Sequence, residues 1–195
     1  MEGASKDYIY YVFDGADSAR RNRMTVKTTK AKSKILSPNL FPVVGIGASA
    51  GGLDAFKKLL HAIPENSGMA YVLVQHLAPN HESLLPELLQ RVTTIPVVQT
   101  TDDIKVLPNH IYIIPSNKMM EANNGVLQLT ARASRPDNTL NHPIDLFFKS
   151  LAEVYQSHAI GVVLSGTATD GTNGLKAIKD YGGHHLCTRR SISSF

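Results

Sequence analysis

The chain has 195 residues, of which 43% are hydrophobic and 18% are charged. This length and composition are typical of one globular domain with a tail, and they exclude two large domains or a low-complexity chain. The single cysteine, Cys187, excludes a disulfide framework and a multi-cysteine zinc site. No apolar run reaches the roughly 20 residues of a membrane helix, so we expect a cytoplasmic protein without membrane insertion.

The formal net charge of +4 is confined to the first 40 residues. They hold eight Lys or Arg against four Asp or Glu, whereas residues 41–195 hold twelve of each. We interpret residues 1–40 as a basic, disordered leader, because they show no sustained hydrophobic period. We interpret residues 1–23 as an upstream extension, since Met24 offers an alternative start. The neutral remainder lacks the spacing of a nucleic-acid reader, so no nucleic-acid partner is expected.

From residue 41 onward, strand-like apolar runs alternate with helical periods. This alternation predicts an α/β fold with an open, mostly parallel, doubly wound sheet and helices on both faces. We expect residues 95–99, 110–115 and 125–129 to form a small antiparallel excursion, with a hairpin turn at 123–125. The expected strands are 42–49, 69–76, 95–99, 110–115, 125–129 and 160–166, and the expected helices are 53–63, 81–92, 141–155 and 173–181.

Polar sites in such sheets collect beyond the carboxyl ends of the strands. After the first strand comes GIGASAGG (45–52), which suits either a phosphate cradle or a nucleophile elbow with Ser49 at its crest. The second strand ends at His76, which is where a base for Ser49 would have to lie. The bland alternatives are a helix cap for Ser49 and an ordinary histidine at position 76.

A third candidate follows the strand at 160–166, where Asp170 precedes a glycine and opens a helix. Helix capping is its bland role. Taken together, Ser49, His76 and Asp170 supply the nucleophile, the base and the orienting acid of a serine hydrolase. The other histidines, His142 among them, show no matching partner and no metal-ligand spacing, so no metal site is expected.

Three segments resemble the catalytic domain of the chemotaxis protein-glutamate methylesterases, the CheB family. They are GIGASAGG (45–52), LVQHLAPNHESLLPELL (73–89) and GVVLSGTATDGTNGL (161–175), in the family's order and at its separations. The similarity covers residues 41–183, and HESLLPELLQR and HPIDLFFKSLAE resemble the form found in hybrid proteins. The resemblance to those hybrids implies association with a methyltransferase and sensor segments.

The resemblance implies hydrolysis of glutamate γ-methyl esters on the cytoplasmic helices of chemoreceptors, with release of methanol, and a related deamidation of glutamines. It places the family's serine at Ser49, its histidine at His76 and its aspartate at Asp170. The backbone N–H that helps to bind the oxyanion falls on Thr167. It implies no metal or organic cofactor, and its implied partner is a methylated chemoreceptor.

Two other interpretations stay open. The segment 45–52 also suits a non-catalytic module that binds an anion or a nucleotide. In the second interpretation, the chain is an inactive fragment, because the family similarity stops at His184 and residues 184–195 lack the apolar alternation of a strand. Residues 183–195 can be encoded by a DNA sequence that, with one G removed, translates into a segment resembling the family's next strand. We therefore expect 184–195 to be a frame-shifted, non-family tail that forms no native strand, and the truncated domain to be weakly stable and impaired.

Overall fold

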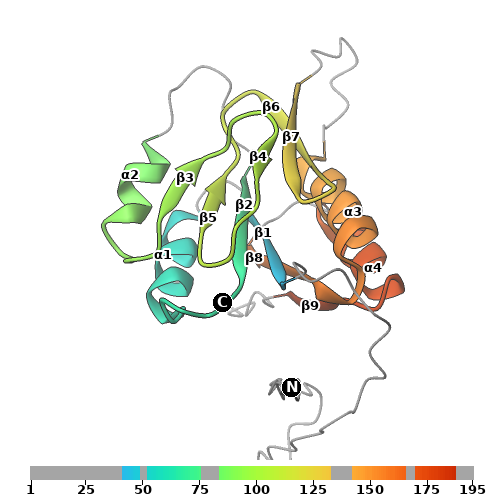
Figure 1. The fold of residues 1–195 in the computed structure, drawn as a ribbon, viewed down its shortest axis with the longest axis horizontal. Coiled ribbons are helices and arrows are strands. Elements are labelled where there is room, and N and C mark those ends of the chain that lie inside the picture. Colours follow the sequence, from blue (N-terminus) through green and yellow to red (C-terminus); the bar gives the residue numbers. More distant parts are fainter. Residues whose placement is uncertain (1–40, 49–51, 76–83, 133–141, 166–169, 188–195) are drawn as a thin grey trace, which may run out of the picture. The chain divides into compact units, whose positions relative to one another are not determined.

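A six-stranded parallel sheet forms the centre of the protein in a computed structural model, which describes residues 41–48, 52–75, 84–132, 142–165 and 170–187 (Figure 1). The expected leader, residues 1–40, and residues 188–195 of the expected tail lie outside the described residues. The strand order is β3-β5-β2-β1-β8-β9. The strands are β1 (Val43–Ala48), β2 (Ala70–Gln75), β3 (Val97–Gln99), β5 (Ile111–Ile113), β8 (Ala159–Ser165) and β9 (His184–Cys187).

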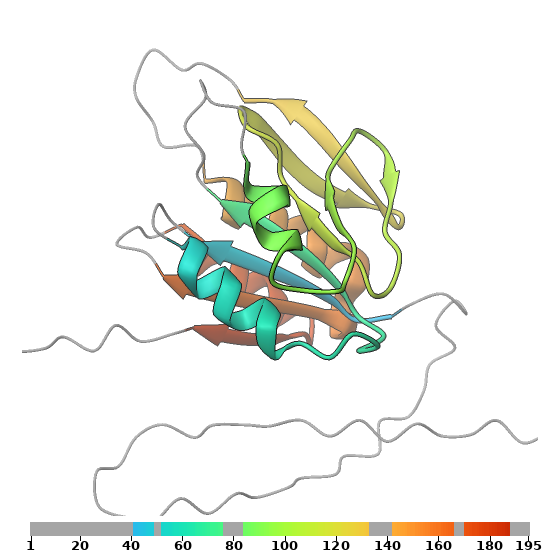
Figure 2. The same ribbon diagram turned by 90° about the vertical axis from the view of Figure 1, so that its left-hand side faces the viewer.

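Helices cover both faces of this sheet (Figure 2), which confirms the expected doubly wound α/β fold. On one face, Phe56 and Leu89 pack into one apolar core; on the other, Phe147 and Ile178 pack into a second. Among the described residues, no helix has the length and apolarity needed to cross a membrane. The helices are α1 (Leu53–Ala62) and α2 (Leu85–Gln90) on the first face, and α3 (Pro143–Tyr155) and α4 (Thr172–Asp180) on the second, with a 3-10 turn at Gln156–His158.

A separate three-stranded antiparallel sheet holds β4 (Ile104–Lys105), β7 (Val126–Ala131) and β6 (Lys118–Asn123), in the order β4-β7-β6. Its hairpin turns at Asn124 and Gly125, whose φ angles of 46° and 83° are those that a tight two-residue turn requires. The turn was therefore predicted correctly from the Asn-Gly pair.

The composition of the antiparallel excursion was predicted wrongly. Residues 95–99 and 110–115 supply β3 and β5, which are parallel members of the main sheet, and of the three expected strands only 125–129 belongs to the small sheet. Short β-branched runs look alike in parallel and antiparallel pairing, so periodicity could not separate them. The strand β6, KMMEAN, was missed because Lys, Glu and Asn are poor strand formers, although Met120 and Ala122 alternate inward.

The expectation that no strand forms after Gly183 is also wrong. Residues His184–Cys187 form β9, which pairs in parallel with β8 at the edge of the sheet. All four side chains of β9 are exposed. The strand pairs with β8 through backbone hydrogen bonds, so it can form without apolar alternation.

Two glycines inside β1 let α3 lie directly against the strand. A Cβ atom at Gly47 would stand 2.6 Å from the Cγ2 of Ile144, and one at Gly45 would stand 2.8 Å from Phe148. Real Cβ atoms essentially never come this close to a neighbour, so a side chain at either position would force Ile144 or Phe148 of α3 to shift. The first two glycines of the segment 45–52 therefore belong to the strand and serve the packing of α3, and they are not part of the turn.

Stability should fall as the pH rises from 10 to 12, because of a tyrosine at the end of α3. Burial, reinforced by the nearby Tyr112, raises the pKa of Tyr155 from 10.0 to about 12. In this interval the unfolded chain releases the proton that the folded chain keeps. The contribution, about 2 to 3 kcal/mol, is complete below pH 10 and lost as the pH rises through 12.

Denaturant titrations of the wild type and of Tyr155→Phe, at about pH 9 and about pH 11.5, measure this loss. The variant should lose less free energy of unfolding than the wild type between the two conditions. An equal loss in both proteins would contradict the assignment to Tyr155.

Candidate active site

Three neighbouring strands end side by side at the carboxyl edge of the main sheet. Ala48, the last residue of β1, is the register partner of Gln75 at the end of β2 and of Ser165 at the end of β8. The chain therefore leaves three adjacent strands at one level. In open α/β sheets this is the edge where ligand and catalytic groups gather.

Of the four residues predicted for catalysis, the structure describes Asp170. Ser49 directly follows β1, His76 directly follows β2, and Thr167 comes after β8; these three lie outside the described residues. Asp170 is a buried side chain just before α4, in the connection that leaves β8. The structure thus places one member of the predicted set at the expected edge.

Asp170 caps the first turn of α3. Its Oδ2 accepts the N–H of Ile144 at 3.1 Å, and its Oδ1 accepts the N–H of Asp145 at 2.8 Å. Both donors belong to the first turn of α3, whose N-cap residue His142 makes no capping bond and whose next residue, Pro143, has no N–H to donate. The carboxylate thus satisfies these two donors of α3, whereas the capping role weighed for Asp170 in the sequence, as the alternative to catalysis, was at α4.

Asp145 in turn caps α4. Its Oδ1 accepts the N–H of Gly171 at 3.0 Å and the N–H of Gly174 at 2.7 Å, and its Oδ2 accepts the side-chain amide of Asn173 at 3.3 Å. The N-cap residue of α4 is Gly171, which has no side chain to offer. The turn just before α4 therefore supplies the carboxylate that caps α3, and α3 supplies the carboxylate that caps α4. We call Asp145 and Asp170 the exchanged caps.

A glycine makes this exchange possible. A Cβ atom at Gly174 would lie 2.5 Å from the Cβ of Phe148 and 3.2 Å from the Cα of Asp145, so any side chain there would separate the two helices. Without one, the first turns of α3 and α4 approach closely enough for each carboxylate to reach the other's backbone.

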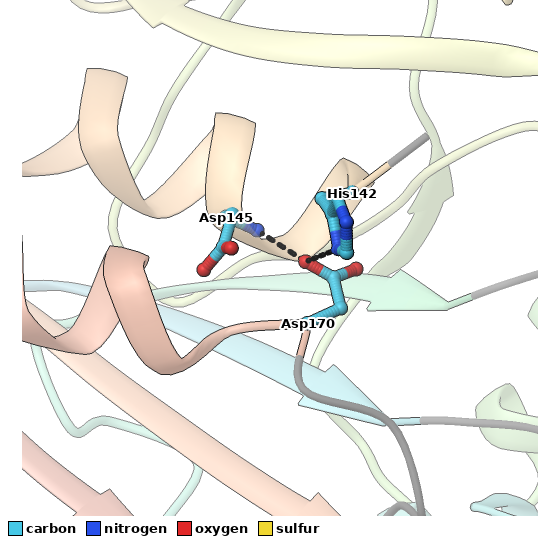
Figure 3. A group of neighbouring side chains, drawn as sticks. All are labelled: His142, Asp145 and Asp170. Carbon is cyan, nitrogen blue, oxygen red and sulfur yellow. Dashed lines mark hydrogen bonds and ion pairs between the residues drawn. The ribbon is translucent and has the colours of Figure 1, made fainter. Parts of the chain in front are cut away.

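His142 stands beside the exchanged caps (Figure 3). Its Nδ1 lies 3.7 Å from Oδ1 of Asp170, and 42% of its side chain is exposed. The prediction that His142 has no matching partner is therefore wrong. Asp145 was also missed, because an acid in the first turn of a helix ordinarily interacts with its own helix, and the sequence carries no signal that it caps another.

The geometry of this cluster bears on metal binding. Ligand atoms of His142, Asp145 and Asp170 all lie within 4.8 Å of one another, which is a spacing that a metal ion could use. However, the carboxylate oxygens already accept N–H donors from two helix N-termini, which carry partial positive charge. A cation placed there would face these donors, so the cluster is built to hold carboxylates rather than a metal.

Divalent metals should therefore leave the melting temperature unchanged. We expect a shift of less than about 1 °C on adding millimolar Mg²⁺, Mn²⁺ or Zn²⁺ in thermal denaturation, because a ligand stabilises only the fold that binds it. A saturable rise that disappears in Asp145→Asn would contradict this interpretation of the cluster.

The class of protein that this geometry defines is an open α/β domain with a buried carboxylate fixed at the carboxyl edge of its parallel sheet. Residues 44–195 match the CheB methylesterase family. The match covers most of the chain, and the chain belongs to this family.

Several curated proteins are similar to this chain. The protein-glutamate methylesterase/protein-glutamine glutaminase of Trichodesmium erythraeum is 31% identical over 172 residues, which cover 87% of this chain and 49% of that protein. The protein of the same name from Salmonella typhimurium is 32% identical over 166 residues, which cover 84% of this chain and 47% of that protein. The chain thus spans about half the length of the curated relatives it matches.

A solved structure has the same fold. The crystal structure of the Thermotoga maritima CheB methylesterase catalytic domain superposes with a TM-score of 0.64 at 29% sequence identity. The match covers 74% of this chain and 78% of that one. The resemblance noted in the sequence is therefore confirmed at the level of family and fold.

Proposed function

We propose that this chain is a serine hydrolase that demethylates glutamate γ-methyl esters on the cytoplasmic helices of chemoreceptors and deamidates glutamines there. The observation that carries the proposal is the common level at which β1, β2 and β8 end, with Asp170 buried at that edge. The names of the relatives, protein-glutamate methylesterase/protein-glutamine glutaminase, support the substrate class.

In the proposed reaction, Ser49 is the nucleophile, His76 the general base and Asp170 the group that orients His76. His76 takes the hydroxyl proton as Oγ of Ser49 attacks the ester carbonyl, and the backbone N–H of Thr167 stabilises the oxyanion that forms. The intermediate collapses, and the proton on His76 passes to the departing methanol. Water, deprotonated by His76, then attacks the Ser49 ester. His76 returns this proton to the departing Oγ of Ser49, and the glutamate carboxylate is released. With glutamine as substrate, ammonia leaves in place of methanol.

The fixed direction of the Asp170 carboxylate supports its role in this scheme. Two backbone N–H groups of α3 hold it, and the side chain is only 2% exposed. An imidazole that must give and receive protons at defined atoms needs an acceptor that does not rotate. The two backbone donors give Asp170 such a fixed direction.

The alternative, an anion-binding module on the Gly-rich segment 45–52, has less support. Its first two glycines, Gly45 and Gly47, lie inside β1 and face α3, where packing already requires them. The cradle would have to form from the rest of the segment. Binding of inorganic phosphate without ester hydrolysis would favour this alternative.

The setting of the activity is part of the proposal. We place the protein in the cytoplasm, with a methylated chemoreceptor as its partner and with methyltransferase and sensor segments associated with it. The support for the associated segments is the similarity of HESLLPELLQR and HPIDLFFKSLAE to hybrid proteins of the family.

Ser49→Ala should abolish methanol release from a methylated receptor fragment. Loss of the nucleophile removes the covalent step, so the rate should fall by at least about 1,000-fold while the melting temperature stays within a few degrees. Gas chromatography of methanol measures the rate. The matched control is Ser67→Ala, which removes a hydroxyl bonded to Tyr71 just before β2, at the opposite edge of the sheet, and should keep its activity. Full activity in Ser49→Ala would contradict the serine mechanism.

Activity should also fall as the pH drops below neutrality. The proposed base must be neutral to take a proton, and an unperturbed imidazole titrates near pH ~6.5. We expect kcat/KM for methanol release to decline on the acid side of about pH 7. A flat profile from about pH 8 to 5 would remove His76 from the role of base.

A further inference from the structure

We propose that Asp145 is a positioning residue for Asp170: it fixes the turn that carries Asp170 and thereby the direction of the Asp170 carboxylate. The effect on rate rests on the proposed function above, whereas the effect on geometry does not. Asp145 itself touches no reacting atom in this scheme and acts through Asp170.

Asp145 makes one hydrogen bond to the side chain of Asp170 and another to the residue that follows Asp170. The N–H of Asp145 donates to Oδ1 of Asp170 at 2.8 Å, while Oδ1 of Asp145 accepts the N–H of Gly171 at 3.0 Å. Gly171 directly follows Asp170, so the second bond fixes the peptide plane that Asp170 shares with it. The two bonds run in opposite directions and close a ring between two segments of the chain.

Without the Asp145 carboxylate, the turn that carries Asp170 would lose two backbone hydrogen bonds. Gly171 has a φ of +99°, a conformation that glycine adopts freely and leaves freely. The N–H groups of Gly171 and Gly174 donate to Oδ1 of Asp145, and these two bonds fix the first turn of α4. Their loss would free the turn to relax, and Asp170 would move with it.

Both aspartates are buried. Asp145 is 4% exposed and Asp170 is 6% exposed, and the two glycine N–H groups are buried with them. Water therefore cannot replace the carboxylate of Asp145 without a rearrangement, and buried donors left without an acceptor are costly. The titratable groups that face Asp145 among the described residues are Asp170 and His142.

The geometric test is amide hydrogen exchange by NMR in Asp145→Ala and Asp145→Asn. The reporter is the N–H of Ile144, whose acceptor is Oδ2 of Asp170 and which both variants leave unchanged. The amide of Ile46, at the centre of β1, reports global unfolding. The control is Ser150→Ala, which removes a buried hydroxyl on the same helix that accepts the N–H of Ala122 and donates to the carbonyl of Phe147.

We expect exchange at Ile144 to quicken relative to Ile46 by about tenfold or more in Asp145→Ala, as a buried bond is lost. In Asp145→Asn, where a neutral and weaker acceptor remains, we expect a few-fold change at Ile144 that accompanies a change at Gly171. Ser150→Ala should leave the ratio unchanged. Unchanged exchange at Ile144 in either folded Asp145 variant would overturn the proposal, so it stays testable if Asp145→Ala does not fold.

The kinetic test places the same substitutions in an Asp170→Asn background. A displacement of about 1 Å at an orienting group costs about 100-fold, so we expect kcat/KM to fall by about that factor in Asp145→Ala and by about tenfold in Asp145→Asn. With Asp170 already replaced, each should cost less than about threefold, since Asp145 acts through it. An equal loss in both backgrounds would show a merely structural role and would overturn the proposal.

The two tests separate this proposal from the proposed function. If the wild type releases no methanol, or Ser49→Ala remains active, the proposed function fails while the exchange at Ile144 still decides whether Asp145 positions Asp170. If methanol release depends on Ser49 but Ile144 keeps its protection, the function stands and the positioning role falls.

Discussion

The exchange of carboxylates between α3 and α4 is the constraint on which the rest of the site depends. Asp170 satisfies the first donors of α3, and Asp145 satisfies those of α4. Neither helix has a capping side chain at its own N-cap, so each needs the other in place. The contact thus ties the connection after β8 to a helix that packs across β1, and it fixes a buried carboxylate at the edge of the sheet.

Small residues set the distances in this arrangement. Gly47 lets Ile144 pack onto β1, and Gly174 lets the first turns of α3 and α4 meet. A site of this kind needs its helices held close and in one register, because the carboxylates act only over hydrogen-bond distances. The packing of the helices on the sheet is therefore also what sets the geometry of the polar groups.

The sequence predicted the parts of the fold that periodicity controls. The buried runs around Ile46 and Val162 are apolar throughout, as strands covered on both faces must be, and α3 begins two residues later than expected, at Pro143. The pairing direction of β3 and β5 was not predictable, because short β-branched runs look alike in parallel and antiparallel sheets. The strand β9 was not predictable either, since its four exposed residues show no apolar alternation.

For the site, the sequence pointed to Asp170, but it did not show that the Asp170 carboxylate caps α3. Its true partners, Ile144 and Asp145, are 26 and 25 residues away in the chain, and only the packing of α3 against α4 brings them together. Asp145 and His142 were missed for the same reason. Contacts between helix ends depend on tertiary structure, and no local pattern records them.

The most direct measurement of the central claim is a crystal structure that gives the distances among Ser49, His76 and Asp170. If the proposed triad is correct, one ring nitrogen of His76 lies within about 3.2 Å of an Asp170 oxygen and the other lies within about 3.5 Å of Oγ of Ser49. A structure in which the ring of His76 points away from Asp170, with His142 hydrogen-bonded to Asp170 instead, would contradict it.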